Sequence, residues 1–285
     1  MPPFLMAGLR FLLAGCVLWL FLLANGRFQA SFKQWRDNAI IGAFMLLGGN
    51  GLVVWAEQQV PSGIATLVIS LNPIFVVLAE WLMVEWARRG LAPNTASPSS
   101  SPNAQYQRAG GLTWCGLLLG MLGLGLLVGP AMFADDATRL DPMRILALIA
   151  ACISWTIGLF ATRHVSQPVD PFTGAAIQMI IGGLWLGLAG CALGEPAQWN
   201  WSTISYQSWW AWLYLVIAGS LIAFTTFIWL TKHCSPTLVS TYAYINPIVA
   251  VYLGWLILDE AIGPRIFAAA AVIVTAVAVI TLSRR

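Results

Sequence analysis

One arginine lies inside an apolar run, where a charged side chain is costly. Arg10 falls within the stretch 4–24, about four residues or roughly 6 Å from its middle at a rise of about 1.5 Å per residue. A charge at that depth costs at least ~2.5 kcal/mol and usually faces a cavity or a partner. Arg10 could therefore bind a carboxylate or another anionic group of a solute through its planar guanidinium. The alternative is a structural tie to a neighbouring carbonyl oxygen or to Glu57.

Other polar and aromatic side chains also fall at the depth expected for a membrane interior. Asn72 and Asn246 each precede a proline, where they could repair an interrupted helix or present amides to a solute. The aromatic side chains could stack on an aromatic or cationic solute, or simply pack between helices. Together with Arg10, the candidate solute-binding residues are Asn50, Trp55, Asn72, Trp155, Gln178, Thr225, Trp229, Tyr242 and Asn246.

Glu80 is the second ionisable candidate, because it lies about one turn before the end of its apolar run. If it lines a cavity, it could bind a cation or a proton; if it is close to the interface, it simply reaches water. No metal or cofactor site is predicted. The five cysteines lack metal-ligand spacing, and no acidic cluster is expected beside His164 or His233.

The elements that must position these residues are predicted by composition and hydropathy. Of 285 residues, 59% are hydrophobic and only 9% are charged, whereas about a quarter of the residues in a soluble domain are charged. Runs long enough to span a bilayer, about 20 residues each, occur at roughly 4–24, 38–58, 62–84, 111–129, 143–163, 172–193, 209–230, 236–258 and 263–283. The chain is therefore predicted to be an all-α polytopic membrane protein with nine helices.

One stretch of the sequence occurs twice. Residues 71–82 have the sequence LNPIFVVLAEWL and residues 245–256 have INPIVAVYLGWL, at a constant offset (246 − 72 = 174) and with six identities in twelve positions. Each copy carries a proline inside an apolar run, where it removes a backbone hydrogen bond and bends the helix. Pro73 and Pro247 are predicted hinges, since paired and interrupted helices indicate the central site of a transporter.

The repeat extends beyond this motif and predicts units of five helices. Trp55 matches Trp229 at an offset of 174, and Gly15 matches Gly183 at 168. Five is odd, so the second copy should enter the membrane inverted relative to the first. We expect a first repeat over 1–129 that lacks its first helix, and a second repeat over 130–285. The polar, Pro- and Ser-rich stretch 87–110 is predicted to be a disordered cytoplasmic linker inside the first.

The basic residues predict how the chain is oriented. Ten lie in loops on one side: Arg27, Lys33, Arg36, Arg88, Arg89, Arg108, Arg163, Lys232, Arg284 and Arg285. Three lie on the other: Arg139, Arg144 and Arg265. Because cytoplasmic loops carry an excess of Lys and Arg, we expect a multi-pass protein of the cell (plasma or inner) membrane with a cytoplasmic C-terminus.

Four segments carry a resemblance to the EamA branch of the drug/metabolite transporter superfamily. They are PPFLMAGLRFLLAG (2–15), SGIATLVISLNPIFVVL (62–78), TWCGLLLGMLGLGLLVG (113–129) and SPTLVSTYAYINPIVAVYLGWLILDE (235–260). The resemblance implies ten helices in two EamA repeats, and transport of amino acids, other metabolites or drugs. The sequence departs from the family pattern at two points. The family's first helix is absent, and the acidic residue that closes the proline helix is clear at Glu260 but shifted or replaced around Glu85.

These observations favour a secondary transporter that binds a small organic solute between two inverted repeats and alternates access. Export is implied by the resemblance alone. An enzyme is not expected, although a membrane-embedded enzyme acting on lipid is an alternative, as is a non-transporting sensor or partner subunit. No nucleic acid partner is expected, the lipid bilayer is the implied surroundings, and a homodimer remains open.

Overall fold

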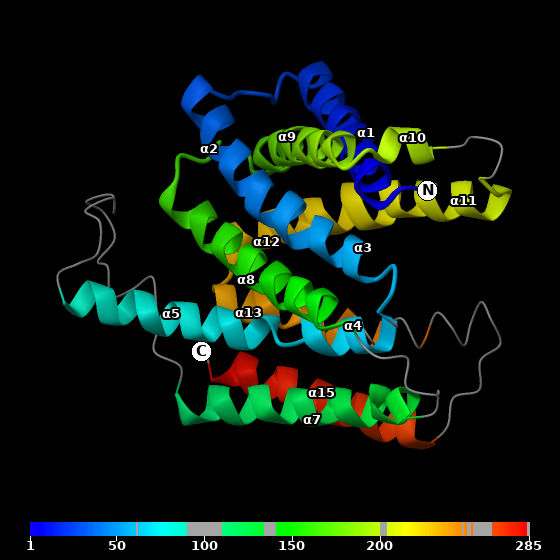
Figure 1. Cartoon of the computed structure of the whole chain (residues 1–285). Coiled ribbons are helices and arrows are strands. Elements are labelled where there is room, and N and C mark those ends of the chain that lie inside the picture. The colour runs from blue at the N-terminus through cyan, green and yellow to red at the C-terminus, as the bar shows by residue number, and fades with distance from the viewer. Residues whose placement is uncertain are drawn as a thin grey trace. The chain divides into compact units, whose positions relative to one another are not determined.

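The structure, a computed structural model, describes residues 1–60, 62–89, 110–133, 141–199, 204–246, 248–249, 252 and 264–283. These residues form helices without a strand (Figure 1). Within the described part of the chain, six helices are long and apolar enough to cross a membrane: Pro3–Ala24, Phe32–Ala56, Pro142–His164, Pro171–Ala192, Tyr206–His233 and Pro264–Leu282. The predicted all-α polytopic membrane fold is confirmed.

Each predicted apolar run contains helix in its described part. The elements are α1 (Pro3–Ala24), α2 (Phe32–Gly42), η1 (Ala43–Gly51), α3 (Leu52–Ala56), α4 (Ser62–Ile69), α5 (Asn72–Arg88), α7 (Gly111–Phe133), α8 (Pro142–His164), α9 (Pro171–Ala192), α10 (Glu195–Gln198), α11 (Tyr206–Tyr214), η3 (Leu215–Phe224), α12 (Thr225–His233), α13 (Pro236–Ser240) and α15 (Pro264–Leu282). The segments η1 and η3 are π-helical and continue directly into their α-helical neighbours.

Two helix boundaries differ from the predicted ones for local reasons. The second helix begins at Phe32 rather than near residue 38, because Ser31 and Gln34 form a capping box before the apolar residues start. The helix of the first proline motif continues to Arg88, beyond the predicted start of the linker at residue 87. There Arg89 pairs with Glu85 one turn earlier, at 3.1 Å. Most of the predicted linker lies outside the described residues.

Pro73 marks a true interruption. Helix α4 ends at Ile69 and α5 begins at Asn72, so that Pro73 occupies the first turn of α5, where a missing backbone N–H costs nothing. The amide of Leu71 turns back to the carbonyl of Val68 at 3.0 Å, which tightens the last turn of α4. Pro247 lies outside the described residues.

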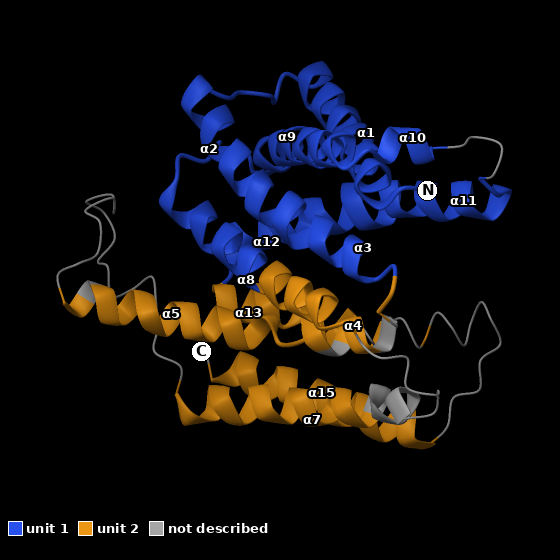
Figure 2. Ribbon diagram, viewed as in Figure 1, with its two compact units in different colours: residues 1–58, 153–234 blue, residues 59–152, 235–285 orange. Residues whose placement is uncertain are grey.

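The chain forms two compact units, each drawn from both halves of the sequence (Figure 2). Unit 1 comprises Met1–Gln58 and Ile153–Cys234, and unit 2 comprises Gln59–Cys152 and Ser235–Arg285. The chain therefore leaves unit 1 after Gln58 and again after Cys234, positions that differ by 176, close to the repeat offset of 174. Each half contributes helices to unit 1 and its proline motif to unit 2.

Unit 1 is built around the contact of α1 with α9, which depends on small residues. A Cβ on Gly8 would lie 2.9 Å from the backbone nitrogen of Gly187, and one on Gly183 would lie 2.8 Å from that of Leu12. Such distances leave no room for a side chain, so the two backbones approach closely. Helices α2, η1 and α12 complete the surroundings of α9.

Unit 2 is built around α7 and α15, and its core contains Tyr244, Leu117 and Ile273. Glycines on one face of α7 again allow the neighbouring helix, α15, to approach closely. A Cβ on Gly116 would lie 3.2 Å from a carbonyl oxygen of α15. On the opposite face, large apolar side chains are exposed at four-residue intervals: Leu118, Leu122 and Leu126. A helix with glycines inward and leucines outward fits a bundle whose outer surface contacts lipid.

Candidate functional site

The buried guanidinium of Arg10 lies beside an amide on a neighbouring helix of unit 1. Its Nη2 donates to Oδ1 of Asn50 at 3.0 Å, and its Cζ lies 4.3 Å from the centre of the Phe11 ring. The side chain is 7% exposed, although α1 brings no acidic residue to pair with it. The sequence suggested a carbonyl oxygen or Glu57 as the structural partner of Arg10. In the structure, Asn50 is a partner of this side chain. A neutral amide oxygen satisfies one donor and leaves the charge of Arg10 uncompensated by Asn50.

Aromatic rings from α8, η3 and α12 lie next to this pair. The rings of Trp155 and Phe227 have centroids 5.3 Å apart, and Phe224 stands edge-on to Phe11 at 6.1 Å. Trp155 also packs over the backbone beside Asn50, since a Cβ on Gly49 would lie 2.8 Å from the indole ring. The "Arg10 cluster" hereafter comprises Arg10, Phe11, Asn50, Trp155, Phe224, Thr225 and Phe227.

Three buried polar groups of the Arg10 cluster have no hydrogen-bonding partner among the residues that the structure describes. They are Nε of Arg10, Nε1 of Trp155 and Oγ1 of Thr225. The first two can only donate, and the threonine hydroxyl can donate as well. Because an unsatisfied buried polar group typically costs 1–3 kcal/mol, such a group calls for a specific explanation. Each of these groups can donate to an acceptor oxygen of a ligand.

Both π-helical segments end at the Arg10 cluster. Segment η1 contains Asn50 as its penultimate residue, and η3 ends at Phe224, directly before Thr225. Shifting η1 by the repeat offset of 174 gives 217–225, which overlaps η3 at 215–224. π-helical turns occur frequently at functional sites. The matched positions of η1 and η3 therefore favour the Arg10 cluster as a candidate functional site.

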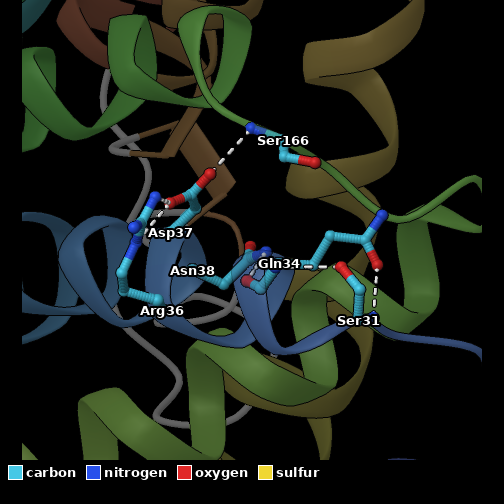
Figure 3. Close-up of polar contacts among 6 residues, drawn as sticks. All are labelled: Ser31, Gln34, Arg36, Asp37, Asn38 and Ser166. Atoms are coloured by element: carbon cyan, nitrogen blue, oxygen red, sulfur yellow. Dashed lines mark hydrogen bonds and ion pairs between the residues drawn. The ribbon is translucent and has the colours of Figure 1, made fainter.

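Gln178 belongs to a different polar group, at the end of unit 1. Its Nε2 donates to Oδ1 of the fully buried Asn38 at 2.7 Å, and the amide of Asn38 donates to the carbonyl of Gln34. In Figure 3 the neighbouring Asp37 lies between the guanidinium of Arg36 and the backbone amide of Ser166, which is 3.0 Å from Oδ2. This network ties the start of α2 to the connection between α8 and α9.

The other two aromatic candidates of unit 1 are Trp229 and Trp55. Trp229 stacks on His233 with ring centroids 4.2 Å apart and borders a hollow at the end of the unit. Trp55 is half-buried in α3. Of the seven predicted candidates in unit 1, the structure thus gathers Arg10, Asn50 and Trp155, and Thr225 directly follows Phe224, whose ring packs against Phe11 and Trp155.

In unit 2, Glu80 is buried and receives a hydrogen bond. Oγ1 of Thr237, in the first turn of α13, donates to Oε2 of Glu80 at 2.6 Å. Only 1% of Glu80 is exposed. The interpretation in which this carboxyl group simply reaches water at the interface therefore does not describe the structure.

At the break before Pro73, a thiol and a hydroxyl group contact backbone carbonyl groups. The thiol of Cys152 lies 3.6 Å from the carbonyl oxygen of Val68 and 3.9 Å from that of Ile69. The hydroxyl of Ser70 donates to the carbonyl oxygen of Thr66 at 2.7 Å and lies 3.5 Å from that of Ala243. Asn72 is buried, Tyr242 is half-buried and Asn246 is exposed. The contacts of the backbone at the break before Pro73 thus include a thiol and a hydroxyl group.

Sequence reasoning did not find several of these residues. Asn38 is the first residue of the predicted run 38–58 and Asp37 falls just before it, and neither was singled out as a candidate. The polar sequence Ser-Pro-Thr at 235–237 is an N-terminal capping signal. Only a search for the donor that a buried Glu80 requires would have indicated Thr237.

Over the described residues, no group of three or more His, Cys, Asp or Glu side chains could hold a metal ion.

The chain is similar in sequence to a family of transporters and to individual transporter proteins. The model of the EamA-like transporter family matches residues 1–86 and 142–282. A protein of Escherichia coli named "Uncharacterized inner membrane transporter YedA" is 32% identical over 284 residues, covering 99% of this chain and 83% of the relative. A Synechocystis protein, also named an uncharacterized transporter, is 27% identical over 275 residues, covering 90% and 75%.

A solved crystal structure has the same fold. It superposes with a TM-score of 0.74 over 100% of this chain and 89% of its own, at 21% sequence identity. At that identity the likeness concerns the fold alone.

Proposed function

The chain belongs to the EamA-like transporter family, and from this premise we propose that it is a secondary transporter that exports a small organic solute. It is a membrane transporter by family and by the names of its relatives. Amino acids, related metabolites and drugs are the solute classes that the family resemblance implies. The driving force would be a gradient of solute or of an ion.

The Arg10 cluster is the observation that carries the proposal. It combines one buried positive charge, three unsatisfied polar groups and a wall of aromatic rings within a single compact unit. The solute would present a carboxylate or similar anionic group to Arg10 and Thr225, with its less polar part against Trp155. Arg10 suits this role because its charge is not neutralised by Asn50 and because a guanidinium can bind a carboxylate with two parallel hydrogen bonds.

Alternating access is supported by the break at Pro73 and by the repeat. The matched π-helical segments, the matched points at which the chain changes unit and the break at Pro73 all agree with two related halves, 1–129 and 130–285. Pro73 and its counterpart Pro247 would act as hinges. Each compact unit takes helices from both halves, so the moving bodies would differ from the sequence halves themselves.

The proposed orientation is supported by where the basic residues of unit 1 lie. Arg27 pairs with Asp170 at 3.0 Å, and Lys232 and Arg163 bind backbone carbonyls of nearby helix ends. The basic residues and their partners lie in or next to the ends of α1, α8, α9 and α12 that meet on this side of unit 1. An excess of basic residues at one end favours its placement in the cytoplasm, and the C-terminus would lie on that same side.

Glu80 is a candidate for coupling to a cation or a proton, since it is an ionisable group buried in a membrane protein. An enzymatic function has less support, because the family and the relatives are transporters. A sensor or partner subunit without transport activity is a second alternative that flux measurements would distinguish.

The test is efflux from cells that express the protein. Cells would be loaded in parallel with labelled amino acids, other labelled carboxylates and cationic dyes, beside cells carrying an empty vector. Faster loss of a carboxylate-bearing solute is expected. Loss of cationic dyes alone would reject the role proposed for Arg10, and no flux of any class would favour the sensor alternative.

A further inference from the structure

A groove opens at the end of unit 1 where the basic residues gather. It has a volume of about 1040 Å³ and lies where α1 and α12 end and where α2 and α9 begin. Its lining includes Arg27, Asp170, Phe172, Trp229, Lys232 and His233. The hollow is large enough for the head group of a lipid, since drug-sized ligands occupy about 300–1,000 Å³.

The charges in the groove favour an anion. Arg27 and Lys232 supply two positive charges, and Asp170 supplies one negative charge. The side chain of Arg27 is 52% exposed even though it pairs with Asp170, so its remaining donors point to an accessible space. Its guanidinium also lies 5.5 Å from the centre of the Phe172 ring, which holds the cation in place.

The wall of the groove is held by polar contacts, which makes it a preformed site. The backbone amide of Ser166 donates to the carboxylate of Asp37 at 3.0 Å. The side-chain amide of Gln34 donates to the backbone carbonyl of Gln167 at 3.1 Å. Lys232 donates to the carbonyls of Pro168 and Val169. The segment that carries Asp170 is thus tied from two helices, α2 and α12.

Apolar side chains are exposed on the rim of the groove. Val169 lines it and is 98% exposed, and Phe32, next to the lining residue Ser31, is 86% exposed. Trp229, stacked on His233, is 40% exposed. Tryptophan is enriched at the level of lipid head groups. Positive charge beside exposed apolar surface, at the ends of membrane-length helices, matches a molecule with an anionic head and hydrocarbon chains.

We propose that this groove binds the head group of an anionic phospholipid, with its phosphate at Arg27 and Lys232 and its acyl chains along the apolar rim. A freely soluble anion would use the same charges without contacting the exposed side chains of Val169 and Phe32. The lipid accounts for both features. Binding at this groove does not depend on solute transport by the Arg10 cluster.

The test is a titration of purified protein in detergent with phosphatidylglycerol, followed by the rise in unfolding temperature. Parallel titrations use phosphatidylcholine, which lacks net charge, and glycerol phosphate, which lacks acyl chains. We expect only phosphatidylglycerol to stabilise the protein. Since each basic residue near an anionic surface contributes about a fivefold change in affinity, Arg27→Gln with Lys232→Gln should weaken its effect by roughly 25-fold.

The matched control is Lys33→Gln with Arg89→Gln, which removes two exposed cations outside the groove, one of them also ion-paired. It should respond to phosphatidylglycerol like the unmodified protein. If the groove variant is too unstable to purify, Arg27→Gln alone serves, with an expected loss of about fivefold. An unchanged response of the groove variant, or an equal response to glycerol phosphate, would overturn the proposal.

Discussion

Arg10 and Asn50 come from separate helices of unit 1 and meet inside it, with Nη2 of the arginine 3.0 Å from Oδ1 of the asparagine. The amide orients the guanidinium without neutralising it. Nε of Arg10 is left without a partner among the described residues. A charge held in this way is available to a second, anionic partner, which is the basis of the proposed transport function.

The first prediction concerns the neutrality of Asn50. Asn50→Asp should give Arg10 a permanent counterion of nearly the same shape, and so reduce transport of an anionic solute by at least tenfold, since about 1.4 kcal/mol corresponds to a factor of ten. The fold should be retained, because an ion pair replaces a hydrogen bond. Efflux and unfolding temperature would be measured on the same preparations. Asn50→Asp with undiminished transport would show that Arg10 does not need its free charge.

The second prediction separates the indole N–H of Trp155 from its ring. Trp155→Phe keeps an aromatic ring against Phe227 and removes a donor that has no partner among the described residues. Stability should change little, while the apparent KM for the solute rises by about fivefold, the equivalent of one hydrogen bond of about 1 kcal/mol. Trp155→Leu should lower both stability and transport. Equal KM values for Trp155→Phe and the unmodified protein would remove the indole from the binding site.

The third prediction tests the close contact between α1 and α9. Gly183→Ala should destabilise the protein, because its Cβ would lie 2.8 Å from the backbone of Leu12, which cannot move independently of α1. The control is Gly187→Ala on the same helix, where a Cβ meets nothing within 4 Å. There the change should stabilise by up to about 1 kcal/mol through helix propensity. Unfolding temperatures in one detergent give the comparison, and a more stable Gly183→Ala variant would contradict the packing described here.

The fourth prediction concerns Glu80 and its donor, Thr237. Glu80→Gln should preserve the fold and abolish the effect of a transmembrane pH gradient on solute transport, leaving exchange of solute for solute intact. Thr237→Val should cost about 1–2 kcal/mol, because a buried carboxyl group loses its hydroxyl donor. Proteoliposomes with and without a pH gradient provide the measurement. A gradient response that persists in Glu80→Gln would assign coupling to another group.

The helices themselves were predictable, since membrane-length apolar runs are the dominant physical feature of the chain. Boundaries set by local polar chemistry were harder to predict. The capping box of Ser31 and Gln34 starts α2 before the apolar run, and the turn before Pro73 divides one run into α4 and α5. These depend on hydrogen bonds over three or four residues that a hydropathy average does not detect.

The composition of the candidate site was predictable in part. Arg10 was evident from its cost in a bilayer, and Asn50 was a candidate because it is a polar residue at the depth expected for the membrane interior. The separation of Gln178 from Arg10 was not predictable, because the bond of Gln178 with Asn38 joins residues 140 positions apart. Trp229 was also grouped with the solute site, although it stacks on His233 and lines the groove together with residues distant in the sequence, such as Arg27 and Asp170.

The measurement that tests the central claim most directly is exchange of a labelled carboxylate-bearing solute in proteoliposomes, with Arg10→Gln and Arg10→Lys at equal protein density. The account predicts that Arg10→Gln loses exchange while retaining its unfolding temperature within a few degrees, since Asn50 can bond to glutamine. Arg10→Lys should retain part of the activity, because it preserves the charge but not the planar fork. Full exchange by a folded Arg10→Gln variant would contradict the account and leave Arg10 as a structural tie.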